Sequence, residues 1–238
     1  MGAQYKIIVK NMTSNNASFY VFQRQASFTG SGSGATVYSS SLATGQLAPS
    51  ASSGAQLEFG FDIQVYAGAV CRNPTTSLAV KSANTLTSTA FNTASLSAAV
   101  QPISLTTVGV NTSANYTNLL LNPLGLSAPY NQAGLSVGCF GFQVPIFGPS
   151  DVEDLFCGCA MINQDSSIVL SSFLTPKPSS QLYCAPLPIF YVKIGAIPVG
   201  QIIIYDTGNA GPCDFTSGAR VISVEYNPDG TFTVTVDA

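Results

Sequence analysis

The clearest pattern in the chain is an alternation of polar and apolar residues from Gln56 to Tyr66. Successive side chains of a β-strand point to opposite faces of a sheet, so this alternation predicts one long, half-buried strand. Glu58 and Asp62 fall on its polar face, where we expect them to be exposed. The predicted core-facing side chains are Leu57, Phe59, Phe61, Ile63 and Val65.

Other apolar runs predict further strands. Residues 5–10 and 19–23 are rich in aromatic and β-branched residues, and we expect them to pair as a hairpin across the polar turn 11–18. The sequence Asn-Pro-Asp-Gly at 227–230 predicts a tight turn between the last two strands. The remaining predicted strands are 77–86, 96–108, 134–144, 189–194, 199–205, 220–226 and 231–236.

Two segments carry a different pattern. Residues 29–53 are mostly Gly, Ser, Ala and Thr, which predicts either a long loop or weakly patterned edge strands. In residues 150–156 a Ser is followed three positions later by Glu, a capping-box spacing that predicts one short helical turn. The acids of that turn, Asp151, Glu153 and Asp154, are either a calcium ligand set or a solvated helix cap.

Many short strands without an internal repeat indicate an all-β protein with very little helix. We expect an antiparallel β-sandwich or jelly-roll-like fold. A chain of 238 residues is long enough for one large β domain or for two packed sandwiches. We expect one compact unit over 1–238, with a division near 110–133 as the alternative.

Composition excludes several classes of function. Charged residues make up 8% of the chain, against roughly 25% in a typical protein, and the net charge is −3 without a basic cluster, which argues against nucleic-acid binding. No apolar run approaches the roughly 18 residues that span a bilayer. Histidine is absent, which excludes Ser-His-Asp and Cys-His catalysis and leaves us expecting no metal and no cofactor.

The cysteines form an even set of six, which predicts three disulfides and export to an oxidising compartment. A zinc site is the alternative, but Cys157-Gly158-Cys159 lacks the usual spacer. Fifteen disulfide pairings remain open. The expected disulfide cysteines are Cys71, Cys139, Cys157, Cys159, Cys184 and Cys213.

Four N-glycosylation sequons support the same compartment, although an Asn-rich chain also produces such triplets by chance. Because Met1 leads directly into a strand pattern, we interpret the chain as the mature form of a secreted protein with an added start methionine. The sequons begin at Asn11, Asn16, Asn111 and Asn115.

The candidate chemistry falls to arginine, tyrosine and lysine. Arg72 follows Cys71, and its guanidinium is able to polarise a ligand oxygen; a surface arginine is the alternative. Tyr191 and Lys193 share one face of a predicted strand, opposite Phe190 and Val192. We expect a binding role for Tyr66, Tyr183 and Tyr205, with packing as the alternative for each tyrosine.

Several segments resemble fungal all-β proteins of secondary-metabolite pathways: YKIIVKN at 5–11, SFYVFQ at 18–23, YAGAVC at 66–71, the stretch 188–200, and the hairpin around Phe232. The resemblance extends to the secreted-type hetero-Diels–Alderases of tropolone sesquiterpenoid biosynthesis. It implies a cofactor-free pocket that orients a heterodiene beside a terpene alkene. Arg72, Tyr191 and Lys193 would then be the hydrogen-bond donors.

This resemblance gives an apolar small molecule as the expected partner and leaves homo-oligomerisation open. Two other classes remain as alternatives. One is a non-catalytic secreted protein that binds sugars or lipophiles, although the absence of tryptophan weakens the sugar case. The other is a structural surface protein, which the low charge and the Ser/Thr/Gly-rich composition suit.

Overall fold

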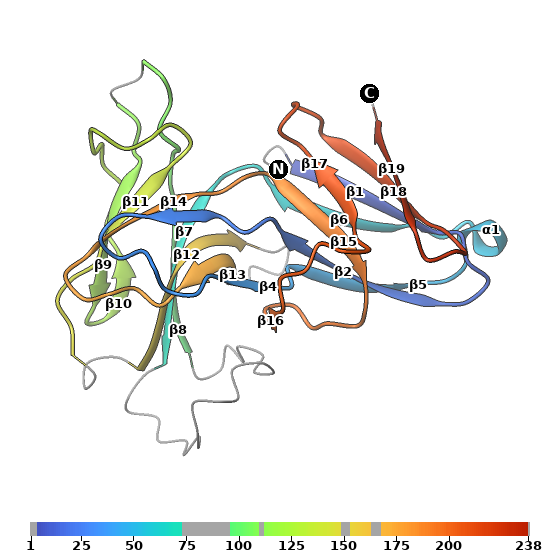
Figure 1. The fold of residues 1–238 in the computed structure, drawn as a ribbon, viewed down its shortest axis with the longest axis horizontal. Coiled ribbons are helices and arrows are strands. Elements are labelled where there is room, and N and C mark those ends of the chain that lie inside the picture. The colour runs from blue at the N-terminus through green and yellow to red at the C-terminus, as the bar shows by residue number, and fades with distance from the viewer. Residues whose placement is uncertain (1–3, 73–95, 110–111, 149–152, 163–167, 238) are drawn as a thin grey trace.

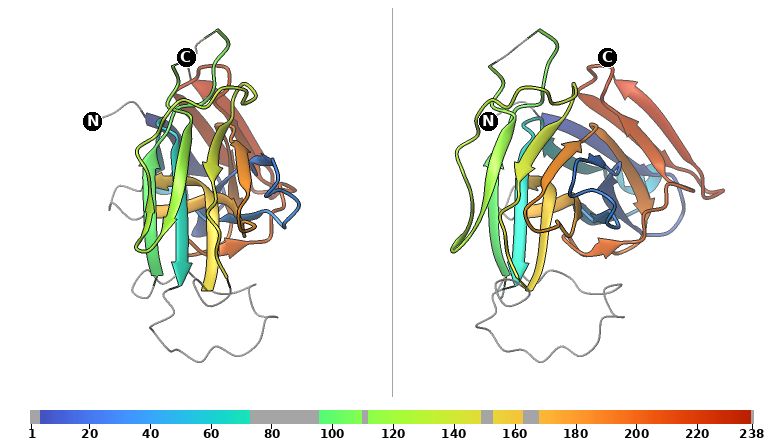
Figure 2. Two further views of the ribbon diagram at one scale, coloured as in Figure 1. Left: turned by 90° about the vertical axis from the view of Figure 1, so that its left-hand side faces the viewer. Right: turned by 60° about the vertical axis from the view of Figure 1, so that its left-hand side comes forward.

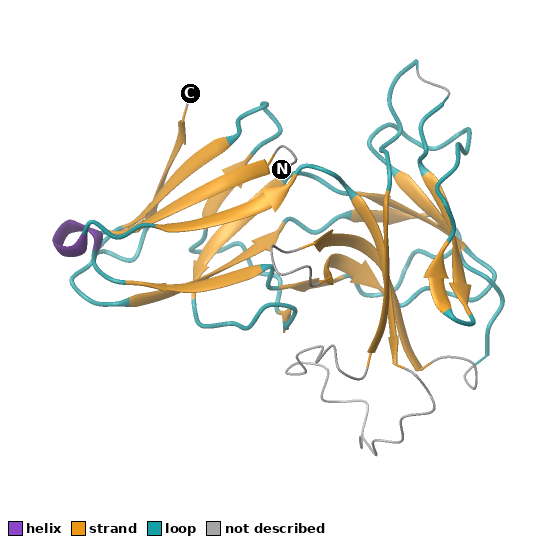
Figure 3. Cartoon of the chain, turned by 180° about the vertical axis from the view of Figure 1, so that it is seen from behind, coloured by secondary structure: helices purple, strands orange, loops and turns teal. Residues whose placement is uncertain are grey.

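The strands form four sheets in a computed structural model that describes residues 4–72, 96–109, 112–148, 153–162 and 168–237. Strands hold 53% of the described residues and helix holds 2%, which confirms the predicted all-β fold with very little helix (Figure 3). No helix among these residues is long and apolar enough to cross a membrane.

The strand order of each sheet is as follows. Sheet 1 contains β19 (Phe232–Asp237), β18 (Val221–Tyr226), β1 (Gln4–Asn11) and β6 (Leu57–Asp62). Sheet 2 contains β17 (Gly211–Asp214), β15 (Ile189–Ile194), β2 (Ala17–Gln23) and β5 (Ala43–Leu47). Sheet 3 contains β16 (Ile202–Ile203), β4 (Tyr38–Ser40), β13 (Ile168–Leu174), β12 (Glu153–Ile162), β7 (Tyr66–Arg72) and β8 (Leu96–Pro102). Sheet 4 contains β10 (Leu124–Leu126), β9 (Tyr116–Leu121), β11 (Phe140–Gln143), β14 (Gln181–Ala185) and β3 (Ser27–Thr29).

Most neighbouring strands are antiparallel, as expected, but β1 pairs with β18 and β9 pairs with β11 in parallel. In Figure 1, sheets 1 and 2 lie in the right half of the molecule and sheets 3 and 4 mainly in the left half. Figure 2 turns the left half toward the viewer. Each half has its own apolar interior.

The first interior, core 1, draws most of its side chains from sheets 1 and 2. Ile7 and Val9 of β1 are fully buried there, opposite Phe19 and Val21 of β2. Successive side chains of a strand point to opposite faces, so each strand presents alternate residues to this core. β2 is apolar on its other face too, where Tyr20 and Phe22 are also buried. The predicted hairpin between these strands is therefore wrong. β1 pairs with β18 and β6, while β2 pairs with β15 and β5.

Asn11 explains why the chain crosses from one sheet to the other instead of turning back. Its side chain is completely buried, and its amide nitrogen donates hydrogen bonds to the carbonyl oxygens of Asn15 (2.7 Å) and Leu47 (3.2 Å). The connection between β1 and β2 is thus tied to β5 in the facing sheet. A buried amide held in this way satisfies its own polar groups while it fixes the path of the chain.

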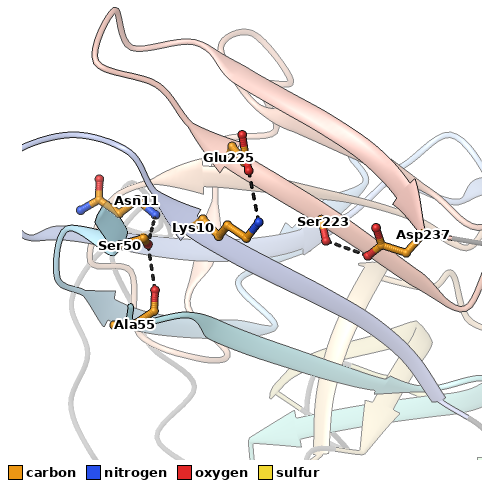
Figure 4. Close-up of polar contacts among 7 residues, drawn as sticks. All are labelled: Lys10, Asn11, Ser50, Ala55, Ser223, Glu225 and Asp237. Atoms are coloured by element: carbon orange, nitrogen blue, oxygen red, sulfur yellow. Dashed lines mark hydrogen bonds and ion pairs between the residues drawn. The ribbon is translucent and has the colours of Figure 1, made fainter. Parts of the chain in front are cut away.

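The helix α1 (Ser50–Ser53) docks on the end of β1 through one hydroxyl. Ser50 Oγ accepts a hydrogen bond from the backbone N–H of Asn11 and donates one to the carbonyl oxygen of Ala55, each at 2.8 Å (Figure 4). Residues 29–53 therefore combine loop with short strands and this helical turn. That result agrees with the edge-strand alternative for part of the segment.

The second interior, core 2, lies between sheets 3 and 4. Sheet 3 also buries its opposite face, where Phe156 and Phe173 pack with half-buried Tyr38. Because both faces of β12 are covered, its sequence is a continuous apolar run rather than an alternating one. The predicted helical turn at 150–156 is wrong for residues 153–156, which belong to β12. Residues 149–152 lie outside the described part of the chain.

All six cysteines are free thiols and all are buried, so the prediction of three disulfides is wrong. Cys157 and Cys159 face core 2, where they behave as small apolar side chains. Gly158 lies between them because a Cβ there would collide with the backbone of Ser172 and Phe173. Burial raises the pKa of Cys159 to about 11 and that of Cys213 to about 12, which keeps these thiols protonated at neutral pH. The cysteines thus give no support for an oxidising compartment.

The predicted long strand at 56–66 bends in its middle. β6 ends at Asp62, β7 begins at Tyr66, and the Gln64 N–H donates a hydrogen bond to Asp62 Oδ1 at 3.0 Å. Phe59 and Phe61 face core 1 as predicted, whereas Val65 packs against core 2. The apolar side chains of this one alternating segment therefore pack into two different cores.

The strongest strands of the C-terminal third are confirmed as β15, β18 and β19. The turn at 227–230 closes the last hairpin, with the Gly230 N–H donating to the Asn227 carbonyl oxygen at 3.0 Å. Three other strands are shorter than predicted, because 96–108, 134–144 and 199–205 contain only β8, β11 and β16. The predicted strand at 77–86 lies outside the described residues.

Candidate functional site

Tyr191, Lys193 and Tyr205 lie together on the outer face of sheet 2. Phe190 and Val192 point into core 1, which confirms the predicted division of faces along β15. The ring of Tyr191 stacks on Phe22 at 5.3 Å between centroids, and Tyr205 meets Phe22 edge-on at 5.9 Å. With Tyr20 these rings form the outer aromatic cluster: Tyr20, Phe22, Tyr191 and Tyr205.

Beside this cluster, the charge of Lys193 is neutralised by Asp206. Its ammonium donates to Asp206 Oδ2 at 2.6 Å and to the Asp206 carbonyl oxygen at 3.1 Å. This contact lowers the pKa of Asp206, while burial raises the pKa of Tyr20. The cluster is therefore a packed layer closed by an ion pair, and Lys193 has little free capacity to bind a ligand.

The other predicted residues lie elsewhere. Arg72 ends β7 in sheet 3, and its side chain is outside the described part of the structure. The Tyr66 hydroxyl donates to Asp62 Oδ2 at 3.0 Å, and the Tyr183 hydroxyl in sheet 4 donates to Gln181 Oε1 at 2.9 Å. The structure thus groups three of the six predicted ligand-contacting residues and spreads the others over sheets 3 and 4.

Two of the four sequon asparagines are interior residues. Asn11 is completely buried, and Asn115 is 1% exposed and donates to Thr106 Oγ1 at 2.8 Å, so neither amide has room for a glycan. Asn16 is exposed, and Asn111 lies outside the described residues. The side-chain amides of Asn11 and Asn115 instead make interior hydrogen bonds.

Of the acids expected in a calcium site or helix cap, only Asp154 has a described side chain. It is exposed, with a φ of 48°, whereas Asp151 and the side chain of Glu153 lie outside the described residues. No group of three or more His, Cys, Asp or Glu side chains in the described residues could hold a metal ion.

A cavity of about 160 Å³ lies where core 1 and core 2 meet, and we call it the junction cavity. It is bounded by the bend between β6 and β7, by the C-terminal end of β12, and by the proline-rich link between β14 and β15. Most of its wall is apolar. The residues that line it are Tyr5, Gln23, 62–65, Leu105, 159–161, 186–188 and Phe190.

Gln23, one of the residues that line the junction cavity, has an unsatisfied polar atom. The residue is 7% exposed, and its Nε2 donates to the Leu187 carbonyl oxygen at 2.8 Å. That bond fixes the orientation of the amide, because only the nitrogen can donate to a carbonyl. The other atom, Oε1, is buried and has no hydrogen-bond partner among the described residues. Such an orphaned acceptor costs roughly 1–3 kcal/mol.

Asp62 adds a carboxylate to the same wall. It is half-buried rather than exposed as predicted, because the bend after β6 turns it toward the junction of the two cores. Each of its oxygens accepts one hydrogen bond, from the Gln64 N–H and from the Tyr66 hydroxyl. Glu58, its neighbour on the polar face, is exposed as predicted and pairs with Lys6 at 2.8 Å.

A second hollow lies beside the β9–β10 hairpin on sheet 4. It has a volume of about 460 Å³ and is open to solvent, with Leu119, Leu121, Pro123 and Ile146 among its wall residues. Among the described residues, no buried, unsatisfied side chain lies in this wall. The junction cavity is therefore the better candidate for a ligand site.

Sequence reasoning did not place Gln23 or Asp62 at a site. Gln23 is the polar last residue of an aromatic strand, and Asp62 is a regular polar position of the alternation from Gln56 to Tyr66. Neither position shows in the sequence that two distant strand ends meet.

Comparison with protein-family models gave no matching family, and no curated protein or solved structure matched the chain significantly. The function must therefore be argued from the site itself.

Proposed function

We propose that this protein binds a small, mostly apolar molecule in the junction cavity. The observation that carries the proposal is that Gln23, which lines a largely apolar hollow, has a buried acceptor, Oε1, without a partner among the described residues. Ligand sites typically combine apolar walls with a few placed polar groups. A ligand with a hydrogen-bond donor would satisfy this atom and would replace water against Phe190 and Met161.

The volume sets the size of the ligand. An apolar cavity of about 150 Å³ accommodates benzene, so about 160 Å³ corresponds to one small ring with one or two substituent atoms. Burying seven carbons at about 0.8 kcal/mol each gives roughly 5.5 kcal/mol, or a Kd near 0.1 mM. This is the affinity expected for a purely apolar probe such as toluene.

A thermal-unfolding assay with toluene tests the proposal. At about ten times this Kd, binding stabilises the folded state by roughly 1.4 kcal/mol, which raises the Tm by about 3–6 °C in a chain of this length. Leu105→Phe adds volume at the cavity wall and should remove the shift. Leu126→Phe, a half-buried position outside that wall, is the matched control and should retain it.

The result that overturns the proposal is the absence of a toluene-dependent Tm shift in the wild-type protein. An equal shift in wild type and Leu105→Phe would place the ligand elsewhere. Calorimetric titration of the same three proteins checks the thermal data at constant temperature.

Cycloaddition, the activity that the sequence resemblance implies, would require a larger cavity. A heterodiene and a terpene alkene must be bound together, and sites for drug-sized ligands measure about 300–1,000 Å³. The junction cavity is smaller, so we propose binding as the function. A cycloaddition assay with and without the protein is the experiment that would extend the proposal to catalysis.

We also propose that the scaffold consists of two β-sandwiches that pack against each other. The support is that core 1 draws most of its side chains from sheets 1 and 2, with Met161 and Val169 added from sheet 3, while core 2 draws mainly on sheets 3 and 4. The junction cavity then lies at the contact between the two sandwiches, a common position for ligand sites.

A further inference from the structure

The polar groups in the wall of the junction cavity are mainly acceptors. Gln23 Oε1 is an unsatisfied acceptor, while Gln23 Nε2 is already used by the Leu187 carbonyl. The other side-chain amide nitrogen, that of Gln64, donates to the carbonyl oxygens of Val65 (2.7 Å) and Ile103 (2.9 Å). Tyr5 adds a hydroxyl that can accept as readily as it donates. A ligand must therefore supply donors.

The charge of the wall is negative. Asp62 is the charged side chain among the residues that line the cavity, and no Lys or Arg belongs to this set. Its two oxygens each accept one hydrogen bond, which leaves lone pairs for a further donor. An anionic ligand would meet this carboxylate without a compensating cation, whereas a cationic ligand would be attracted to it.

The apolar part of the wall suits the stem of such a ligand. The rings of Tyr5 and Phe190 lie 6.2 Å apart between centroids at the cavity, and Met161 adds a flexible apolar side chain. Aromatic faces attract ammonium groups as well as hydrocarbon. The exposed Arg220 guanidinium lies 5.7 Å from the centroid of the Tyr5 ring but outside the cavity wall, where solvent screens its repulsion.

We infer that the junction cavity selects a small protonated amine on an apolar stem, with the ammonium bonded to Gln23 Oε1 and attracted by the Asp62 carboxylate. This inference rests on the proposed function, which it narrows to one ligand class. The ammonium would satisfy the orphaned acceptor with a charge-assisted hydrogen bond, which is about twice as strong as a neutral one. The stem would pack against Phe190 and Met161.

Four probes of nearly equal size separate this inference from the proposed function. They are toluene without a donor, benzyl alcohol with a neutral donor, benzylamine with a cationic donor, and benzoate with a negative charge. We expect calorimetric titration of the wild-type protein to give benzylamine the highest affinity, about tenfold above toluene, and benzoate the lowest.

Asp62→Asn tests the role of the carboxylate. The asparagine can still accept from the Gln64 N–H and can donate to the Tyr66 hydroxyl, so the bend should be retained. We expect this variant to lose most of the preference for benzylamine over toluene. Glu58→Gln removes one charge from the same strand outside the cavity, and it should leave both affinities unchanged.

The outcomes are distinct. Equal affinities for toluene, benzyl alcohol and benzylamine, or the highest affinity for benzoate, would overturn the amine inference while binding itself stands. An equal loss of benzylamine affinity in Glu58→Gln and Asp62→Asn would show that the preference for benzylamine comes from the overall net charge of −3 and not from Asp62. That result would also overturn the inference. If none of the four probes binds the wild type, the cavity holds only water, and both proposals fail.

Discussion

Phe61 is the residue whose truncation tests the placement of core 1 most severely. It is 3% exposed on β6 and stacks on Phe190 with ring centroids 4.7 Å apart and planes 6° from parallel. Phe190 in turn lines the junction cavity. Phe61→Ala therefore removes a buried ring and also the side chain that supports the cavity wall.

The expected cost follows from the buried area. A phenylalanine ring buries roughly 150–200 Å², which at about 25 cal/mol per Å² corresponds to about 4–5 kcal/mol. Measured Phe→Ala substitutions in cores cost about 3–5 kcal/mol because the structure relaxes only partly around the void. We therefore expect Phe61→Ala to lower the free energy of unfolding by about 4 kcal/mol.

Urea unfolding followed by tyrosine fluorescence measures this cost as a lower midpoint with an unchanged slope. Phe232→Ala is the matched control, because Phe232 is only half-buried at the edge of core 1 and should cost about 1–2 kcal/mol. A loss below about 1 kcal/mol for Phe61→Ala would show that this face of β6 is not in a core.

Three further predictions concern the thiols, the helix and the outer ion pair. Thiol titration should find six free thiols in denaturant and almost none reactive in the native protein, and a protein without titratable thiols would contradict the buried, unpaired cysteines. Ser50→Ala should cost about 1–2 kcal/mol in urea unfolding because the Asn11 N–H loses its acceptor, whereas exposed Ser52→Ala should cost under about 0.5 kcal/mol. Since the Lys193 ammonium lowers the pKa of Asp206, the pair stabilises the folded state above the ordinary carboxyl pKa, and this contribution disappears as pH falls through the lowered value. Lys193→Met should raise the Asp206 pKa in an NMR titration, and an unchanged pKa would refute the ion pair.

Local pattern predicted the fold class and the strongest strands because those depend on neighbouring residues. The alternation of Phe59 and Phe61 with polar residues identified the core face of β6, and the Asn-Pro-Asp-Gly turn identified the last hairpin. The pairing of β1 with β18 was not predictable in this way, because it joins residues more than two hundred positions apart. Parallel pairing leaves no turn in the sequence to indicate it.

The cysteines and the candidate site show a second limit. An even cysteine count is compatible with disulfides and with buried thiols, and only the packing of Cys157 and Cys159 against core 2 distinguishes the two. Gln23 and Asp62 reach one cavity from separate sheets, because β2 ends and β6 bends at the same junction. Nothing in either local sequence indicates that meeting.

The central claim, that the junction cavity holds a small molecule, is tested most directly by a crystal structure of the wild-type protein equilibrated with benzylamine. We predict density for one ring between Phe190 and Met161, with the ammonium nitrogen within about 3.2 Å of Gln23 Oε1. Density only for ordered water at Gln23, with no ring in the cavity at a saturating probe concentration, would contradict the claim.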